Sequence, residues 1–181
     1  VIGYIETHGR KDTVRISEGL PEIKRKKIEY KDTVVEETDI DEIIKIKPEI
    51  VIIDELAHTN APGSRHKKRY QDILEILNCG IDVWTTLNVQ HMESRASIVE
   101  NITGIKIGET VPDYIVEQAD RIEIIDITPE ELQKRVREGK VYAPEKTDLA
   151  LNNFFREGNI TALREIALHV VAKLVDKDIT E

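Results

Sequence analysis

The sequence is poor in cysteine and in long apolar runs, and each shortage excludes a class of protein. Cys79 is the single cysteine among 181 residues, which excludes an intramolecular disulfide framework and a multi-cysteine zinc or iron–sulfur site. No apolar run approaches the roughly 18–20 residues of a membrane span, and no charged-then-apolar signal segment opens the chain. We therefore expect a segment that does not span a membrane and that works in a reducing compartment.

The sequence also has fewer basic residues than acidic ones. The 35 acidic residues exceed the 26 lysines and arginines, giving a formal net charge of −9. This balance disfavours nucleic acid and anionic membrane surfaces as general partners, so we expect discrete partners. The first residue is Val1, on an apolar run and without a methionine, and we expect an upstream portion to be missing. The 40% hydrophobic content is enough for a sizeable core without disulfides or a structural metal.

Short β-rich runs alternate with helical patterns from Val1 to Asp126, which is typical of βαβ units. The run at 50–53 is apolar at every position, as in a central strand buried on both faces. The run at 27–30 follows basic residues and predicts a solvated edge strand. The pattern therefore predicts a three-layer α/β fold, with a mostly parallel sheet and helices on both faces. The five expected strands are 1–5, 27–30, 50–53, 82–86 and 121–125.

Capping signals place the helices between and after these strands. Asp39 with Glu42, and Thr128 with Pro129 and Glu131, are typical helix starts. Beyond Gly139 two helical stretches follow without an intervening strand, and we interpret them as a helical pair packed on or leading out of the sheet domain. We therefore expect an α/β domain at 1–139 and a helical extension at 140–181. The helices are expected at 39–47, 69–78, 92–102, 113–118, 128–139, 145–156 and 161–175.

Asp54 and Glu55 directly follow the apolar strand at 50–53. In P-loop nucleotidases an apolar strand ending in Asp-Glu is the Walker B arrangement, in which the acid holds Mg²⁺ through its water shell and its neighbour polarises water. The pattern alone is weak evidence for a nucleotide site, because many apolar strands end in Asp. A helix-capping role for the two acids is the structural alternative.

The loop after these acids favours the nucleotide interpretation. It runs for 13 residues between strand and helix, whereas simple connections take about 2–6 residues. Arg65 adds positive charge beside the two carboxylates, and Arg10, in the loop after the first strand, offers a fork that suits phosphate. Solvated surface charge is the alternative for both arginines.

Thr86 and Asn88 follow the strand at 82–86 and are candidates for sensing a ligand, although helix capping explains them equally well. Four histidines lie in or near the loops, but none is spaced from another as helix-borne metal ligands are. No G-x-x-x-x-G-K-[ST] motif is present in the sequence. Either the site binds no nucleotide or the phosphate-binding loop lies upstream of Val1.

The stretch from Val51 to His66, VIIDELAHTNAPGSRH, resembles the amino-terminal domain of the KdpD family of potassium-responsive sensor histidine kinases. The resemblance covers nearly the whole chain, and motifs of this length are specific. The further blocks that carry it are 4–10, 25–30, 68–72, 85–91, 109–113, 138–142 and 153–159.

The resemblance implies a cytoplasmic, regulatory, P-loop-type domain of a bacterial inner-membrane kinase. It implies a Walker A loop just upstream, ATP or a related nucleotide with Mg²⁺ as cofactor, and Asp54 as the Walker B residue holding the metal through water. The parent would transfer phosphate to a response regulator and contact this domain through its other domains, whereas no catalytic residue is expected in this segment. A non-catalytic interaction module is the rival hypothesis, and a stand-alone hydrolase is a third, without an evident nucleophile and base.

Overall fold

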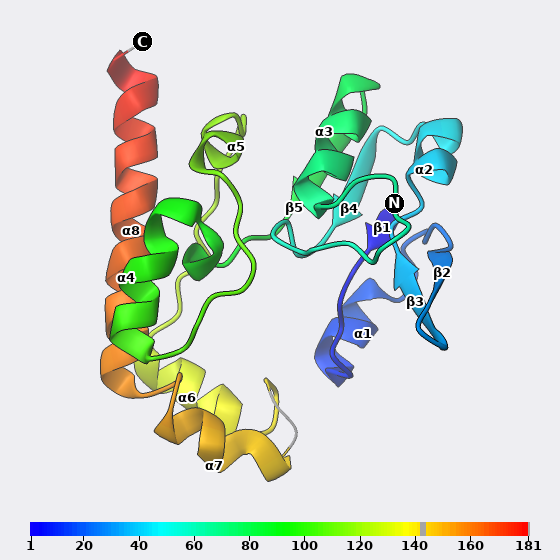
Figure 1. The fold of residues 1–181 in the computed structure, drawn as a ribbon. Coiled ribbons are helices and arrows are strands. Elements are labelled where there is room, and N and C mark those ends of the chain that lie inside the picture. Colours follow the sequence, from blue (N-terminus) through cyan, green and yellow to red (C-terminus); the bar gives the residue numbers. More distant parts are fainter. Residues whose placement is uncertain (142–143, 181) are drawn as a thin grey trace. The chain divides into compact units, whose positions relative to one another are not determined.

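The computed structural model describes residues 1–141 and 144–180 (Figure 1). Residue contacts divide the chain into two compact units, Val1–Asn88 and Val89–Glu181. The sequence placed a domain limit at 139 instead. That domain assignment stays a prediction, because compact units of internal contact do not by themselves define functional domains.

The first unit contains a three-stranded parallel sheet, as the βαβ pattern predicts. β4 (Ile50–Ile53) is central, between β1 (Ile2–Tyr4) and β5 (Asp82–Thr85). Val51 and Ile53 are fully buried, which is why this apolar run takes the middle position. The mixed α/β class and the central placement of 50–53 are confirmed.

A β-hairpin beside this sheet corrects the prediction for 27–30. The strand is present as β2 (Lys26–Tyr30), but it pairs antiparallel with β3 (Thr33–Glu37) and is not an edge of the parallel sheet. Lys31 and Asp32 connect the strands with φ of 45° and 60°, as a two-residue turn requires. Lysine is unusual at such a position, so the turn gave no clear signal and β3 was missed.

Three helices belong to the first unit, and two of them match their predicted limits. α2 (Ile40–Ile46) begins after Asp39, whose side chain accepts a hydrogen bond from the Glu42 backbone N–H. α3 (Arg69–Asn78) has the predicted bounds, and Ile73 and Ile76 are its buried apolar residues. α1 (Lys11–Ser17) buries none of its residues.

Gly3 of β1 lies in a tightly packed part of this unit. A Cβ added there would lie 2.8 Å from Val51 Cγ2, 3.1 Å from Ile43 Cδ1 and 3.2 Å from Ile53 Cγ1. Val51, Ile43 and Ile53 are fully buried and have no room to retreat. A residue without a side chain is therefore what lets β1 and α2 approach the central strand.

We expect Gly3→Ala to lower the free energy of unfolding by about 1–3 kcal/mol, because the added methyl overpacks this contact. Urea denaturation followed by circular dichroism measures the effect. Gly108→Ala is the control, since no atom lies within 4 Å of a Cβ added there. Equal stability of the two variants would contradict the packing argument.

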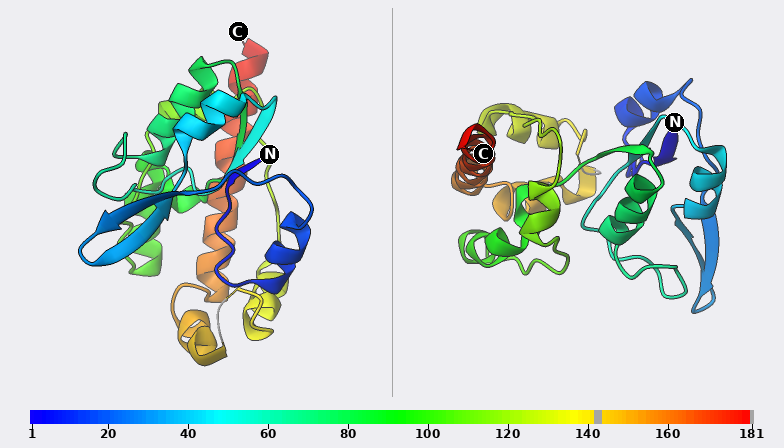
Figure 2. Two further views of the ribbon diagram at one scale, coloured as in Figure 1. Left: turned by 90° about the vertical axis from the view of Figure 1, so that its right-hand side faces the viewer. Right: turned by 90° about the horizontal axis from the view of Figure 1, so that it is seen from above.

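The second unit is helical. It contains a 3₁₀ turn, η1, and helices that pack as α4 on α8 and α6 on both α7 and α8. Ile160 and Val170 of α8 are buried. Within residues 1–141 and 144–180, no helix is both long and apolar enough to cross a membrane. The bounds are η1 (Val89–His91), α4 (Glu93–Thr103), α5 (Asp113–Glu117), α6 (Pro129–Arg137), α7 (Pro144–Asn152) and α8 (Glu157–Thr180). Figure 2 draws the ribbon from two further sides.

The predicted strand at 121–125 is wrong. The residues form no strand, and Ile125 is 87% exposed. Alternating isoleucines gave the signal, but a strand needs a neighbour, and the described residues of this unit include no strand element. The segment is instead joined to α8 by Asp126, which accepts two hydrogen bonds of 2.6 Å from Arg164.

The predicted caps in this unit are confirmed in part. Thr128 accepts a hydrogen bond from the Glu131 backbone N–H at the start of α6, and Gly139 follows its end with φ of 68°. The two later helices are present as α7 and α8. Gly158 and Asn159, which were expected to separate helices, lie inside the first turns of α8 instead.

Candidate functional site

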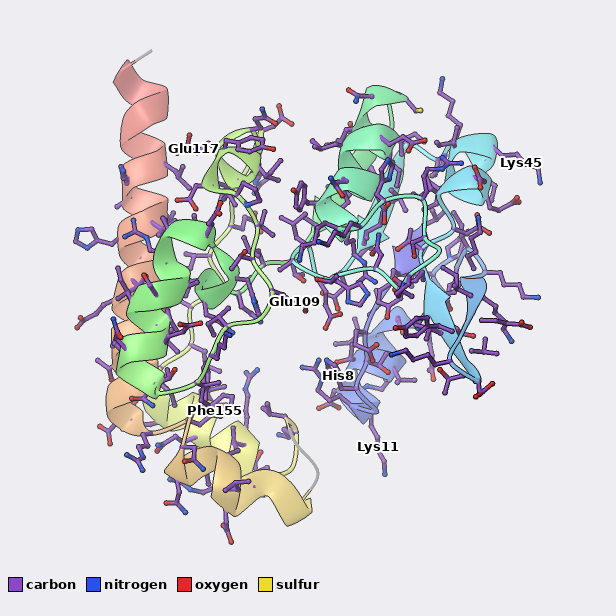
Figure 3. The ribbon with its side chains drawn as sticks, viewed as in Figure 1. His8, Lys11, Lys45, Glu109, Glu117 and Phe155 are labelled. Carbon is purple, nitrogen blue, oxygen red and sulfur yellow. The ribbon has the colours of Figure 1, made fainter. Side chains whose placement is uncertain are left out.

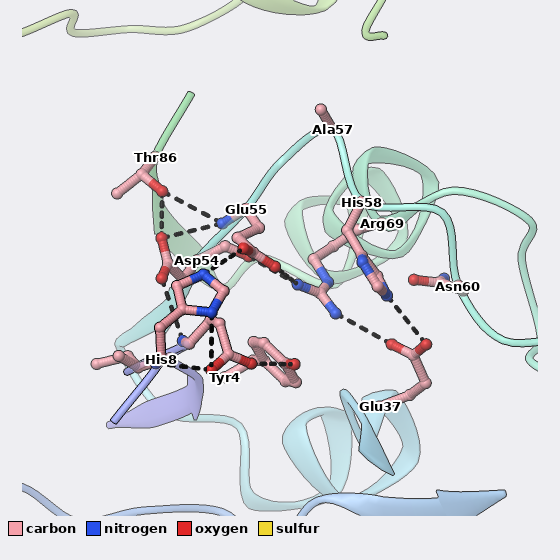
Figure 4. Close-up of polar contacts among 12 residues, drawn as sticks. Tyr4, His8, Glu37, Asp54, Glu55, Ala57, His58, Asn60, Arg69 and Thr86 are labelled. Atoms are coloured by element: carbon pink, nitrogen blue, oxygen red, sulfur yellow. Dashed lines mark hydrogen bonds and ion pairs between the residues drawn. The ribbon is translucent and has the colours of Figure 1, made fainter. Parts of the chain in front are cut away.

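The polar residues gather where β1, β4 and β5 end, in the first unit. Parallel strands all end at one edge of their sheet, so the loops that follow them converge there. Figure 3 shows the side chains, with His8 labelled in the loop between β1 and α1. Figure 4 shows the polar contacts at this edge, and the site is built from them.

Asp54 is held by donors from all three loops. Its Oδ2 accepts from the Glu6 backbone N–H at 3.1 Å, and its Oδ1 accepts from the Glu55 N–H at 3.0 Å. The Thr86 hydroxyl also donates to Oδ1. The carboxylate of the half-buried Asp54 is therefore fixed in orientation, and Oδ2 keeps one lone pair without a donor among these contacts.

Glu55 turns the chain sharply away from the strand, with φ of 60°. Its side chain lies between a histidine and an arginine: Oε1 is 3.5 Å from His8 Nε2, and Oε2 is 3.6 Å from Arg69 Nη1. At 37% exposure the Glu55 side chain still reaches solvent. The two acids of the predicted pair thus have different surroundings, since backbone N–H groups and a hydroxyl hold Asp54, whereas Glu55 faces the guanidinium of Arg69 and the ring of His8.

The loop after β1 contributes an acid that the sequence analysis missed. Glu6 accepts a hydrogen bond of 2.9 Å from the His8 backbone N–H, and this bond is the main reason that the pKa of Glu6 lies below its usual value. His8 Nδ1 is 3.6 Å from the same carboxylate. His8 and Gly9 both have a positive φ in this tight turn, 47° and 72°, and Gly9 is the signal for such a turn in the sequence, although it does not show which groups the turn brings together.

Arg69 joins the site to a buried cluster. It is fully buried, donates from Nη1 to the Asp54 carbonyl oxygen at 3.1 Å and from Nη2 to Glu37 Oε2 at 3.0 Å. Its guanidinium lies 3.9 Å from the centroid of the Tyr4 ring. Burial raises the pKa of the Tyr4 hydroxyl, although the charge of Arg69 opposes that shift.

Glu37 is the anionic centre of this cluster and is 3% exposed. Burial opposes its ionisation, but hydrogen bonds from His58 (3.0 Å) and the Ala61 N–H (2.7 Å), with the charges of His58 and Arg69, hold the pKa of Glu37 below its usual value. Glu37 closes β3, the strand that the sequence analysis missed. Its partnership with Arg69 therefore had no signal in the sequence.

A second buried carboxylate fixes the far part of the long loop. Asp72 accepts from Asn60 Nδ2 at 2.7 Å and contacts His66 Nδ1 at 2.8 Å. Burial raises the pKa of Asp72, and these partners only reduce the shift. His58 and His66 thus contact different carboxylates.

Three of the six predicted site residues come together: Asp54, Glu55 and Thr86. Arg65 lies elsewhere, paired with Asp41 and with Glu75 (2.5 Å). The roles predicted for all six residues stay predictions, because no contact here reports a ligand. Arg10 donates from Nε to the Thr7 carbonyl oxygen at 3.1 Å, and Asn88 is exposed two residues beyond Thr86.

The donor set suits a hydrated cation better than a closed ligand cage. Within the described residues, no group of three or more His, Cys, Asp and Glu side chains is placed to hold a metal ion. Mg²⁺ usually keeps several waters and takes one or two carboxylates. The free lone pair of Asp54 Oδ2 fits that mode of binding.

Together, fold and site define a mixed α/β domain with a polar centre at the carboxyl edge of a parallel sheet. A family model described as "KdpD: Osmosensitive K+ channel His kinase sensor domain" matches residues 1–175. The chain therefore belongs to the KdpD sensor-domain family.

Curated relatives agree with this family over almost the whole chain. "Sensor protein KdpD" of Clostridium acetobutylicum is 52% identical over 179 residues, which are 99% of this chain. The proteins of the same name from Escherichia coli K12 and Mycobacterium tuberculosis H37Rv are 48% and 49% identical, over 98% and 93% of the chain. The chain spans 20% of the length of each of these three relatives.

Proposed function

We propose that this chain is the regulatory, nucleotide-binding domain of a sensor histidine kinase that controls potassium uptake. The names of its relatives support the sensor role, since they are called sensor proteins. In this proposal the parent is an inner-membrane kinase that phosphorylates a response regulator. This segment lies on its cytoplasmic side, contacts its other domains and contributes no catalytic residue.

The site is proposed to bind ATP or a related nucleotide with Mg²⁺, within a three-layer P-loop-type fold that has helices on both faces of the sheet. The observation that carries the proposal is the fixed carboxylate of Asp54 at the end of the central strand, held by three donors from three loops. Asp54 would hold the metal's water shell, and Glu55 would orient water if hydrolysis occurs. An upstream Walker A loop would hold the phosphates.

The other predicted residues take unequal parts in this proposal. Arg10 lies in the loop after β1 and would contact phosphate, and Asn88 would sense the ligand from the loop after β5. Arg65 would need to leave both Asp41 and Glu75 before it reached phosphate. Its present ion pairs therefore make Arg65 the weakest of the proposed contacts.

We expect Asp54→Asn to weaken Mg²⁺-dependent ATP binding by about tenfold or more, since a charge-assisted interaction is lost. Calorimetric titration of the full-length sensor protein with ATP and MgCl₂ measures this. Asp82→Asn is the matched control, because Asp82 is exposed at the opposite end of β5. We also expect the present chain, without upstream residues, to bind ATP negligibly; micromolar binding by it would contradict the need for an upstream loop.

A non-catalytic docking module is the second candidate. The observation that favours it is that the arginines near the acids are engaged within the protein: Arg69 faces Glu55, and Arg65 faces Asp41 and Glu75. In this case Asp54→Asn would leave ATP titrations of the full-length protein unchanged from wild type. Docking on the other kinase domains would then be the function to measure.

A further inference from the structure

Thr86 occupies a special place among the predicted site residues, because its one hydroxyl contacts both members of the acidic pair. Its proton is donated to Asp54 Oδ1, and its oxygen accepts from the Glu55 backbone N–H at 3.2 Å (Figure 4). A hydroxyl has one proton to donate, so the hydroxyl of Thr86 has none left for a ligand.

The two oxygens of Asp54 consequently differ. Oδ1 accepts from the Glu55 N–H and from the Thr86 hydroxyl, so both of its lone-pair directions are used. Oδ2 accepts only from the Glu6 N–H, at 3.1 Å. A carboxylate anchored through one oxygen presents the other in a fixed direction.

We infer that Thr86 is a positioning residue that fixes Asp54 through Oδ1, and that Oδ2 is the oxygen that accepts from the water shell of a divalent cation. This inference rests on the proposed function and deepens it, since it replaces ligand sensing by Thr86 with an action through Asp54. It also assigns the two oxygens separate tasks, one structural and one toward the ligand.

The local geometry makes the role testable without disturbing the fold. Thr86 follows the last residue of β5 and is exposed, so the change of its hydroxyl to a methyl removes no buried packing. Thr86→Val removes both hydrogen bonds and keeps the branched shape, whereas Thr86→Ser keeps the hydroxyl. Thr85→Val is the matched control, because neighbouring strand residues face opposite sides of the sheet.

Two measurements on the full-length sensor protein separate this inference from the proposed function. The first is amide hydrogen exchange at Glu55, which needs no nucleotide. We expect Thr86→Val to speed this exchange by up to about fivefold, because the Glu55 N–H then keeps only its bond to Asp54 Oδ1 and that carboxylate has lost its anchor, while Thr86→Ser and Thr85→Val stay near wild type. Unchanged exchange at Glu55 in Thr86→Val overturns the positioning role.

The second measurement is calorimetric titration with ATP, with and without MgCl₂. We expect Thr86→Val to weaken binding about tenfold in MgCl₂ and to leave metal-free binding unchanged, and Thr86→Ser to restore the wild-type affinity. Equal weakening with and without Mg²⁺ would mean that Thr86 contacts the nucleotide itself, which overturns the inference. If exchange changes as expected but even Asp54→Asn binds ATP like wild type, the nucleotide proposal fails and the assignment of Oδ2 fails with it, whereas the anchoring of Asp54 by Thr86 stands.

Discussion

Replacement of Arg69 by methionine is expected to lower the free energy of unfolding by about 3–5 kcal/mol, because one partner of a buried ion pair is removed. Arg69 is fully buried, and the carboxylate of Glu37 that it neutralises is almost as inaccessible, with 4% of its side chain exposed. In Arg69→Met that carboxylate stays buried with only His58 and one backbone N–H as partners. Methionine keeps the length of the chain against Tyr4, so the loss reflects charge rather than volume.

Arg65→Met is the matched control for this experiment. Arg65 also pairs with two acids, Asp41 and Glu75, but it is 39% exposed, and ion pairs at the surface contribute about 0–1 kcal/mol. A second variant, Arg69→Met combined with Glu37→Gln, removes the uncompensated charge and should recover part of the loss. Urea denaturation provides all three values; similar losses for Arg65→Met and Arg69→Met would contradict the role of burial.

Arg69 also shows which features of this protein its sequence patterns can predict and which they cannot. Its position at the start of a helix is predicted by the pattern at 69–78, and its charge beside Asp54 and Glu55 is visible in the sequence. Its burial against Glu37 is not, because Glu37 belongs to a strand whose turn, Lys31 and Asp32, lacks the usual turn residues. Local signals predicted the central strand and the helices other than α1, whereas contacts between distant segments could not be predicted from them.

In the candidate site, too, some residues could be predicted from local sequence patterns and others could not. The acids Asp54 and Glu55 and the hydroxyl of Thr86 follow strands that the apolar patterns identify, so their convergence could be predicted from the topology of a parallel sheet. Glu6 and His8 are brought in by a backbone turn with a positive φ at His8 and at Gly9; the glycine signals a turn in the sequence, but the contacts that the turn creates are not visible there.

The prediction of a strand at 121–125 is wrong for a third reason. Its isoleucines alternate as in a strand, and the pattern alone cannot tell whether a neighbouring strand is available. In the described residues of its unit there is no strand element to pair with, and the segment has no regular secondary structure and is exposed. Period-two patterns predict the capacity to form a strand, whereas the partner is a property of the tertiary fold.

Low pH is expected to weaken the buried ion pair between Glu37 and Arg69. The pKa of Glu37 in the folded protein lies below its ordinary value of 4.5, so ionised Glu37 contributes stability that is fully present above pH 4.5. This contribution is lost as the pH falls through the folded pKa, because protonation leaves Arg69 without its carboxylate. Asp72 has the opposite sign, since burial raises its pKa and its ionisation costs stability.

Comparison with Glu37→Gln isolates the contribution of Glu37 from that of Asp72 and the other acids, which both proteins share. We expect wild type to be more stable than Glu37→Gln at pH 5 and above, because glutamine keeps the acceptor for Ala61 but not the charge for Arg69. The difference should shrink below pH 4.5 and disappear once Glu37 is protonated in the folded wild type. Urea denaturation of both proteins from pH 7 to pH 3 measures this difference, and a gap that stays constant to pH 3 would mean that the charge of Glu37 does not stabilise the fold.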